Sequence, residues 1–189
     1  MSVTTTIPVL ETERLILRAP KVSDADVFMA FLTSERAQFV GGPVSRSHAA
    51  RSFSSFAGQW VLRGYGLFIG ALKSDPDTPL GGFGVFHPVI QEEPEFGWTL
   101  YDAAHEGKGY VTEAMRRIIP WAWDVMGVDT AQSHIDEGNE ASVAVARALG
   151  ATFDAKQTEI ANAPGGEFHD DAEGGPRVNI WRHHKGALR

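Results

Sequence analysis

The chain has 189 residues, of which 43% are hydrophobic and 22% charged, and it carries a formal net charge of −7 and no cysteine. This composition is that of a globular protein, and the length predicts one domain over residues 1–189. The lack of cysteine excludes disulfides, thiolate metal sites and a cysteine nucleophile. Because we find no basic cluster, no apolar run of ~20 residues and no signal-like start, we expect a cytoplasmic protein that binds neither nucleic acid nor membrane.

The first third of the chain predicts one strand and two helices. Leucine at alternate positions predicts a strand over 13–19, which a proline then ends. The pair Ser23-Asp24 is typical of a helix N-cap and predicts a helix that reaches about residue 32. Apolar residues at helical spacing predict a second helix over about 45–62.

The rest of the chain alternates strands and helices. A Ser-Asp-Pro-Asp turn at 74–77 predicts a hairpin. A proline at 120 predicts a kink or a split near Ile119 in the helix that carries it. Residues 161–175, rich in Gly, Asp and Glu, predict a loop. The expected strands are 66–72, 82–86, 95–100, 129–135 and 178–183, and the expected helices are 112–123 and 139–149.

This order of elements predicts a fold class. Strands and helices alternate without an internal repeat and without a linker long enough to divide domains. We therefore expect a mixed α/β (α+β) fold around one sheet, mostly antiparallel, with a parallel βαβ unit in its middle.

The most informative segment is 106–114, which reads Glu-Gly-Lys-Gly-Tyr-Val-Thr-Glu-Ala. A glycine turn that opens a helix points unpaired N–H groups and the positive end of the helix dipole at one place, which favours phosphate. The segment does not match a P-loop, and a dinucleotide fingerprint would need glycine where Thr112 stands. At this point a coenzyme A diphosphate and a tight turn without a ligand both stay open.

Four motifs in order decide between these alternatives. They are Glu95-Phe96-Gly97-Trp98-x-Leu100, 107–114, Asn139-Glu140-Ala141-Ser142 and Leu149-Gly150. Together they resemble the GNAT superfamily of acyl-CoA-dependent N-acetyltransferases, and in particular the branch with the ribosomal-protein N-terminal acetyltransferases. The opening segment 12–18, Thr-Glu-Arg-Leu-Ile-Leu-Arg, is typical of that branch. The resemblance implies a single GNAT-like domain with a twisted sheet that splays between its two central strands, and helices on both faces.

The resemblance also implies acetyl-CoA as cosubstrate, no metal, and a primary amine as acceptor, either a small molecule or a protein N-terminus. The protein would act as a monomer or a homodimer. Main-chain amides of the glycine turn would hold the CoA diphosphate, a strand edge would pair with the pantetheine arm, and Ser142 would lie near the thiol. The expected cofactor-binding residues are Trp98, Thr99, Leu100, Gly107, Lys108, Gly109, Tyr110, Val111, Thr112, Asn139 and Ser142.

Two residues are expected to be catalytic. Glu95, which begins a strand beside the expected splay, is the first choice for the base, and His134 and His87 are other proton acceptors near strand ends. Many family members use a tyrosine as the acid at the position of Ala146, and in this branch Ser142 is the substitute candidate. A serine there also suits an ordinary helix N-terminus, and a glutamate at a strand end can be merely solvated.

Some residues depart from the family pattern or offer other chemistry. Glu106 stands where the family has Gln or Arg, and Val111 where it has Gly or Ala. A carboxylate beside a diphosphate is unfavourable unless it turns to solvent. Because Ala146 lacks the usual acid and Glu106 breaks the motif, a non-catalytic acyl-CoA-binding module is the alternative function. The pair His183-His184 lacks clustered acidic partners, and we expect no metal there.

Overall fold

The computed structural model describes residues 6–169 and 176–189. Within that part of the chain, eight strands form one sheet in the order β1-β2-β3-β4-β5-β6-β8-β7. Neighbouring strands there are antiparallel except β5 and β6, which are parallel. The predicted sheet is thereby confirmed. The strands are β1 (Leu10–Glu11), β2 (Leu15–Arg18), β3 (Leu67–Leu72), β4 (Asp75–Phe86), β5 (Glu95–Leu100), β6 (Thr130–Asp136), β7 (Thr152–Phe153) and β8 (Val178–His184).

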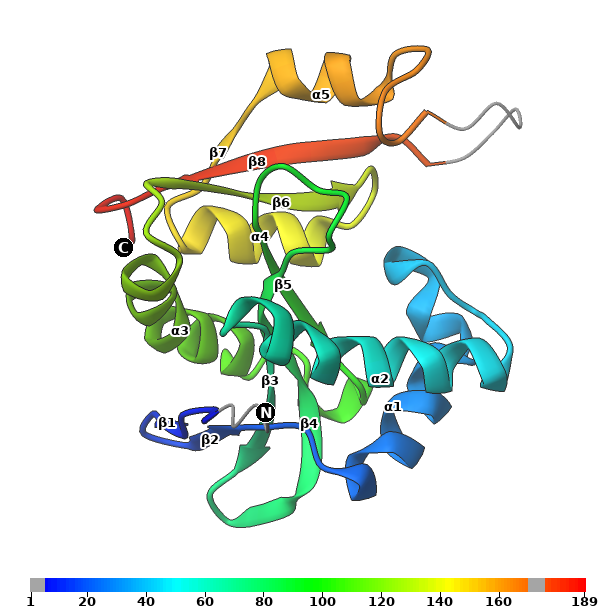
Figure 1. Cartoon of the computed structure of the whole chain (residues 1–189), viewed down its shortest axis with the longest axis vertical. Helices are drawn as coiled ribbons and strands as arrows, with labels where there is room; N and C mark the ends of the chain where they lie inside the picture. The colour runs from blue at the N-terminus through cyan, green and yellow to red at the C-terminus, as the bar shows by residue number, and fades with distance from the viewer. Residues whose placement is uncertain (1–5, 170–175) are drawn as a thin grey trace.

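Helices surround this sheet. Figure 1 shows β6, β8 and α5 at one end of the molecule and β1 and β2 at the other, with α2 and α3 between them. The α-helices are α1 (Ala25–Leu32), α2 (Arg46–Arg63), α3 (Tyr110–Met126), α4 (Glu140–Ala148) and α5 (Ala155–Asn162). Short 3₁₀ helices are η1 (Val22–Asp24), η2 (Glu35–Val40) and η3 (Ala103–His105). In the part of the chain that is described, no helix combines the length and the apolar composition needed to cross a bilayer.

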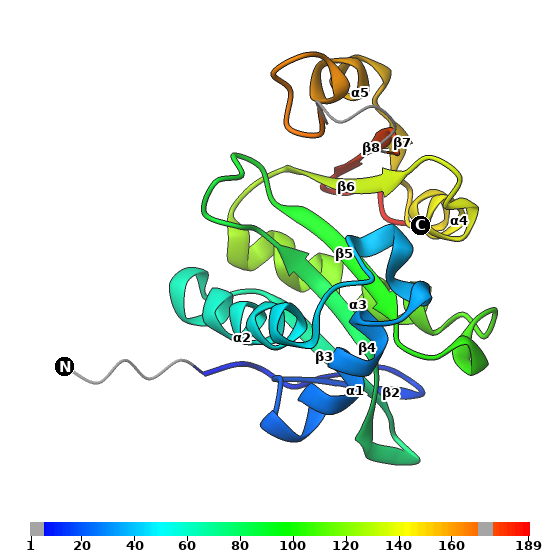
Figure 2. The same ribbon diagram turned by 90° about the vertical axis from the view of Figure 1, so that its right-hand side faces the viewer.

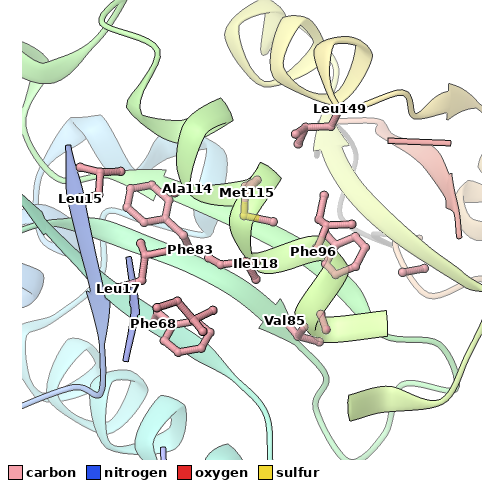
Figure 3. Close-up of a cluster of buried hydrophobic side chains, with 14 of the residues drawn as sticks. Leu15, Leu17, Phe68, Phe83, Val85, Phe96, Ala114, Met115, Ile118 and Leu149 are labelled. Carbon is pink, nitrogen blue, oxygen red and sulfur yellow. The ribbon is translucent and has the colours of Figure 1, made fainter. Parts of the chain in front are cut away.

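The largest core cluster lies between α3 and one face of the sheet. Figure 3 shows Met115 and Ile118 of α3 pointing among Leu17, Phe83 and Phe96 of three strands. Each of these side chains is at most 1% exposed. Burial of large apolar side chains is the main stabilising contribution to such a fold, and here it fixes the position of α3 against the sheet.

The central strands part soon after they meet. β5 and β6 share one register pair, Glu95 with Gln132. Figure 2 shows β5 and β6 running in different directions beyond that point. The expected splay is therefore confirmed, and it leaves one edge of β5 without a partner strand over most of its length.

Two local features differ from what the sequence predicted. The hairpin turns at Lys73–Ser74 rather than at 74–77, because Leu72 pairs with Asp75 and β4 already begins there. Of the two outcomes predicted for Pro120, a kink or a split, the split was wrong, because Pro120 lies inside the continuous helix α3. This proline is exposed, so water can satisfy the carbonyl that its missing N–H leaves free.

The C-terminal third holds elements that periodicity did not predict. The expected loop over 161–175 begins later, because helix α5 continues to Asn162, and residues 163–169 have no helix or strand. The remainder of that prediction, 170–175, lies outside the described residues. Strand β7, with two residues, is too short to show a pattern, and the same holds for the two-residue strand β1 near the N-terminus.

Candidate active site

Two cavities meet where β5 and β6 part. The first, of about 530 Å³, lies along the glycine turn and the first residues of α3, and we call it the turn groove. The second, of about 500 Å³, lies between the sheet and helices α1 and α2, and we call it the aromatic cavity. Both are lined by Trp98, Thr99, Asn139 and Ser142. A molecule in the groove can therefore reach one in the cavity at these four residues.

The glycine turn has the geometry that its sequence predicts. Gly107 and Gly109 have φ values of 70° and 76°, in the left-handed region that favours glycine. Gly109 is the N-cap of α3, and the first intrahelical bond runs from Glu113 N to Gly109 O. Among the described residues, the N–H groups of residues 110–112 have no hydrogen-bond partner. These donors and the helix dipole face the turn groove, which makes it suited to an anion.

A salt bridge joins the two sides of the turn groove. Arg36 of η2 donates to Glu106 Oε1 at 2.7 Å, and both residues line the groove. The carboxylate of Glu106 is thus neutralised by a cation from the opposite wall. Of the expected cofactor residues, Lys108 alone does not line the groove, although its carbonyl accepts from Arg14 at 2.9 Å.

The free edge of β5 borders the same groove. β5 pairs with β4 on one side from Glu95 to Leu100, whereas on the other side it meets β6 only at Glu95. Beyond that pair, the Ser133 hydroxyl donates to the Phe96 carbonyl at 2.6 Å. The backbone from Trp98 to Leu100 therefore presents an open strand edge, which can pair with amide groups of a ligand.

Ser142 is held at the junction of the two cavities. Its backbone N–H donates to the side chain of Asn139, the N-cap of α4, at 3.2 Å. The indole Nε1 of Trp98 donates to Ser142 Oγ at 3.3 Å. Since an indole N–H can only donate, the Ser142 hydroxyl accepts this bond and its own proton stays free to point elsewhere. This geometry is compatible with a Ser142 hydroxyl that acts in the reaction. It is equally compatible with a serine that only belongs to the capped first turn of α4.

Glu95 and His134 form a pair across β5 and β6. His134 Nδ1 lies 3.2 Å from Glu95 Oε2, and His134 Nε2 lies 3.1 Å from Gln132 Oε1. Burial opposes a charge on His134, but the hydrogen bond and charge of Glu95, helped by Glu167 and Glu93, outweigh it and raise the pKa of His134 above the usual histidine value. Both Glu95 and His134 line the aromatic cavity, so the structure brings together two residues that sequence offered as alternatives.

The other candidate residues lie elsewhere or are buried. His87 contacts Tyr65 Oη at 2.8 Å and does not line either cavity. Ala146 has no ionisable group and is fully buried in a cluster with Ile135 and Trp181, so this position supplies no acid. Among the described residues, no group of three or more His, Asp or Glu is placed to hold a metal ion.

A family model described as the acetyltransferase (GNAT) domain matches residues 14–152. This range includes the glycine turn, strands β5 and β6, and helix α4. The chain belongs to this family. An acetyltransferase from Agrobacterium tumefaciens strain C58 is 30% identical, and its crystal structure matches with a TM-score of 0.79 over 97% of this chain and 98% of that chain. The uncharacterised N-acetyltransferase p20 of Bacillus licheniformis is 25% identical over 144 residues, 74% of this chain and 80% of its own length.

A more distant solved structure shares the fold. RimL, a ribosomal L7/L12 alpha-N-protein acetyltransferase solved in complex with coenzyme A, is 17% identical, with a TM-score of 0.70 over 94% of this chain and 98% of that chain. The GNAT family and fold that the four motifs predicted are thus confirmed.

Sequence reasoning missed two residues at this site. The sequence around Arg36 does not indicate a binding role for this residue, because a single arginine in a short helix between two longer ones belongs to no recognisable motif. Tyr101 directly follows Leu100 and lines the aromatic cavity, but only the fold shows which way its ring turns.

Proposed function

We propose that this GNAT protein transfers an acetyl group from acetyl-CoA to a primary amine by direct attack, without a covalent enzyme intermediate. The observation that carries the proposal is the junction of the two cavities at Trp98, Thr99, Asn139 and Ser142. A thioester that enters along the turn groove and an amine that enters through the aromatic cavity would meet there.

The turn groove would hold the cofactor through groups of the main chain. The unpaired amides of residues 110–112 and the glycine turn would bind the diphosphate, and the open edge of β5 from Trp98 to Leu100 would pair with the pantetheine amides. Asn139 and Ser142 would border the thioester end. The salt bridge with Arg36 would offset part of the repulsion between the Glu106 carboxylate and the diphosphate.

The Glu95–His134 pair would accept the proton of the amine. An ammonium has no lone pair, so it must lose a proton before its nitrogen can attack the thioester carbonyl carbon. The new C–N bond forms as the C–S bond breaks, and the proton released from nitrogen passes to the pair. Within the pair, Glu95 would take the proton. Both ring nitrogens of His134 lie against oxygens, Nδ1 against Glu95 Oε2 and Nε2 against Gln132 Oε1, so the histidine donates and positions the carboxylate.

Ser142 would supply the hydrogen-bond donor that the buried Ala146 cannot. Because Trp98 already donates to Ser142 Oγ, the hydroxyl proton is free to donate to the carbonyl oxygen in the transition state or to the departing sulfur. As the C–S bond breaks, the nitrogen loses its second proton and the departing sulfur gains one through the Ser142 hydroxyl, so the products are the N-acetylated amine and the free thiol of coenzyme A.

The first test combines binding and turnover. Isothermal titration with coenzyme A and with acetyl-CoA should show binding, and a free-thiol release assay with acetyl-CoA should report turnover against pools of amines and peptides. If neither ligand binds at millimolar concentration, the proposal is wrong. Binding without turnover across the panel would instead favour a non-catalytic acyl-CoA-binding module, for which the alanine at 146 is the motivating observation.

A further inference from the structure

Aromatic rings begin directly beside Glu95. Phe86 is the cross-strand partner of Glu95, so the two side chains are neighbours on the sheet. The ring of Phe86 lies 6.1 Å from that of Phe56, edge to face, and Phe56 lies 5.3 Å from Phe28 in the same manner. Phe28 in turn contacts Tyr101 with ring centroids 5.8 Å apart. All five residues line the aromatic cavity, which therefore runs from a carboxylate into a continuous cluster of rings.

The charges of the cavity lie at one end. Among the described residues that line it, the side chains that can carry a charge near neutral pH are Glu95, His134 and Asp136, all from β5 and β6. The opposite end, formed by α1, α2 and β4, is apolar. A ligand with a cationic head and an apolar body would match this distribution, whereas a ligand with charges along its whole length would not.

A glycine leaves the floor of the cavity open. Gly97 lies on β5 and lines the cavity, and a Cβ added there would meet only Leu67 Cδ2, at 4.0 Å. Its φ is not positive, so the backbone accepts a larger residue without strain. The volume above Gly97 is therefore space that a side chain could fill, rather than packed core.

We propose that the acceptor is a primary amine attached to an aromatic group by a short linker, an arylalkylamine, with its amino group at Glu95 and its ring packed against Phe56 and Phe86. This inference rests on the proposed function and names the substrate class of the same site. The same chemistry is presented by a free arylalkylamine and by a peptide whose first residue is phenylalanine. A buried phenyl group is worth roughly 10- to 100-fold in kcat/KM over an amine that lacks it.

The test compares acceptors and variants. Thiol release from acetyl-CoA is measured with 2-phenylethylamine, ethylamine and spermidine, and with two peptides that differ only in beginning with Phe or Ser. We expect kcat/KM for 2-phenylethylamine to exceed that for the other two amines by at least about 10-fold. The two peptides show whether a free amine or a peptide N-terminus is the better source of the same chemistry.

Two variants alter the aromatic cavity, and a third serves as control. Phe56→Ala removes a wall, Gly97→Val fills the floor, and each should lower kcat/KM for 2-phenylethylamine by about 10-fold or more. Phe153→Ala truncates a phenylalanine that is 50% exposed and lines neither cavity, and it should leave this value unchanged. Titration of coenzyme A into each variant verifies that the fold and the turn groove are intact.

The outcomes separate this inference from the proposed function. Turnover that favours spermidine or ethylamine would overturn the inference and leave the acetyltransferase proposal standing. If no amine turns over, the thermal shift that 2-phenylethylamine causes in the coenzyme A complex is measured instead. A shift that Gly97→Val abolishes supports the cavity assignment, although the proposed reaction fails. The absence of a shift overturns both the cavity assignment and the proposed reaction.

Discussion

Arg14 contacts both the first turn of α3 and the glycine turn before it. Its guanidinium lies 2.6 Å from Glu113 Oε2 and donates to the Lys108 carbonyl at 2.9 Å, while its backbone N–H donates to Glu113 Oε1 at 2.9 Å. It also lies over the ring of Tyr110, 4.5 Å from the centroid. Two motifs about a hundred residues apart thus form one structure, in which the N-terminal segment holds the turn that faces the groove.

Glu113→Ala is expected to loosen this structure. The carboxylate accepts bonds from Thr12 and Arg14, and although burial opposes its charge, these bonds lower the pKa of Glu113 below the usual value. The variant should lose roughly 1–3 kcal/mol in the free energy of unfolding and bind coenzyme A more weakly. Urea denaturation at pH 7 and calorimetric titration measure the two effects. The stabilisation should be present above the unfolded pKa and fade as pH falls below it.

A matched control is Glu140→Ala. Glu140 also lies in the first turn of a helix, α4, and is exposed, so it shares the favourable interaction with the helix dipole but not the arginine. If both variants lose the same stability, the bonds to Arg14 contribute nothing beyond the dipole.

Ser142→Ala is expected to lower kcat by about 100-fold with little change in the KM for acetyl-CoA. The substitution removes the hydroxyl but keeps the backbone N–H that caps α4 on Asn139, so the helix should remain intact. Steady-state thiol release gives both parameters. Trp98→Phe, which removes only the indole donor, should have a smaller effect, and equal losses in the two variants would mean that the serine acts only through its bond to Trp98.

Glu95→Gln is expected to lower the pKa of His134. The glutamine keeps the shape but removes the charge that favours the protonated ring, so desolvation by burial is no longer outweighed to the same degree. NMR titration of the histidine rings measures this in the resting protein, without reference to turnover. His87, whose pKa burial and the charge of Arg63 lower, lies outside both cavities and should not move. An unchanged His134 would show that the two residues do not act as a pair.

The sequence predicted the elements that hold most of the site. Glycine spacing located the turn, and alternation and helical spacing located β5, α3, β6 and α4, because each of these carries a strong local pattern. Asn139 and Ser142 could be placed because an N-cap is a local signal. These features depend on residues that are neighbours in the chain.

Pairings between distant segments could not be predicted. Nothing in a single sequence shows that Arg14 contacts Glu113, that Arg36 contacts Glu106, or that Glu95 contacts His134. The choice between a kink and a split at the proline at 120 could not be made for a similar reason, since it depends on whether that turn of the helix faces the core or solvent, which only packing decides.

The unfolding free energy should fall as pH is lowered from about 6.5 to about 4. Burial, with a smaller effect of the His184 charge, lowers the pKa of His183 to about 4, and its Nε2 lies 2.9 Å from Ser133 Oγ. Between these pH values the unfolded chain binds a proton at this position and the folded protein does not, so stability rises with pH. The loss on acidification should be roughly 2–3 kcal/mol by urea denaturation at pH 7 and pH 4.5. His183→Gln should reduce this difference, whereas the exposed His184→Gln should largely keep it.

Glu106→Gln is expected to strengthen coenzyme A binding. The carboxylate lies at the turn groove, where it would repel the diphosphate, and it occupies Arg36, which lines the same groove. Removing it abolishes the repulsion and releases the arginine, and both effects favour an anion. At the high dielectric of an exposed pair, the change should be roughly 3- to 5-fold in Kd at low salt and smaller at high salt.

Arg36→Gln provides the complementary experiment. It leaves Glu106 without its cation, so coenzyme A should bind more weakly than to the unchanged protein, and the double variant should lie between the two single ones. Calorimetric titration at two salt concentrations gives all four Kd values. If Arg36→Gln binds coenzyme A as tightly as the unchanged protein, Arg36 does not offset the charge of Glu106. The glutamate that stands where the family has Gln or Arg would then be tolerated because its side chain, 59% exposed, is screened by solvent alone.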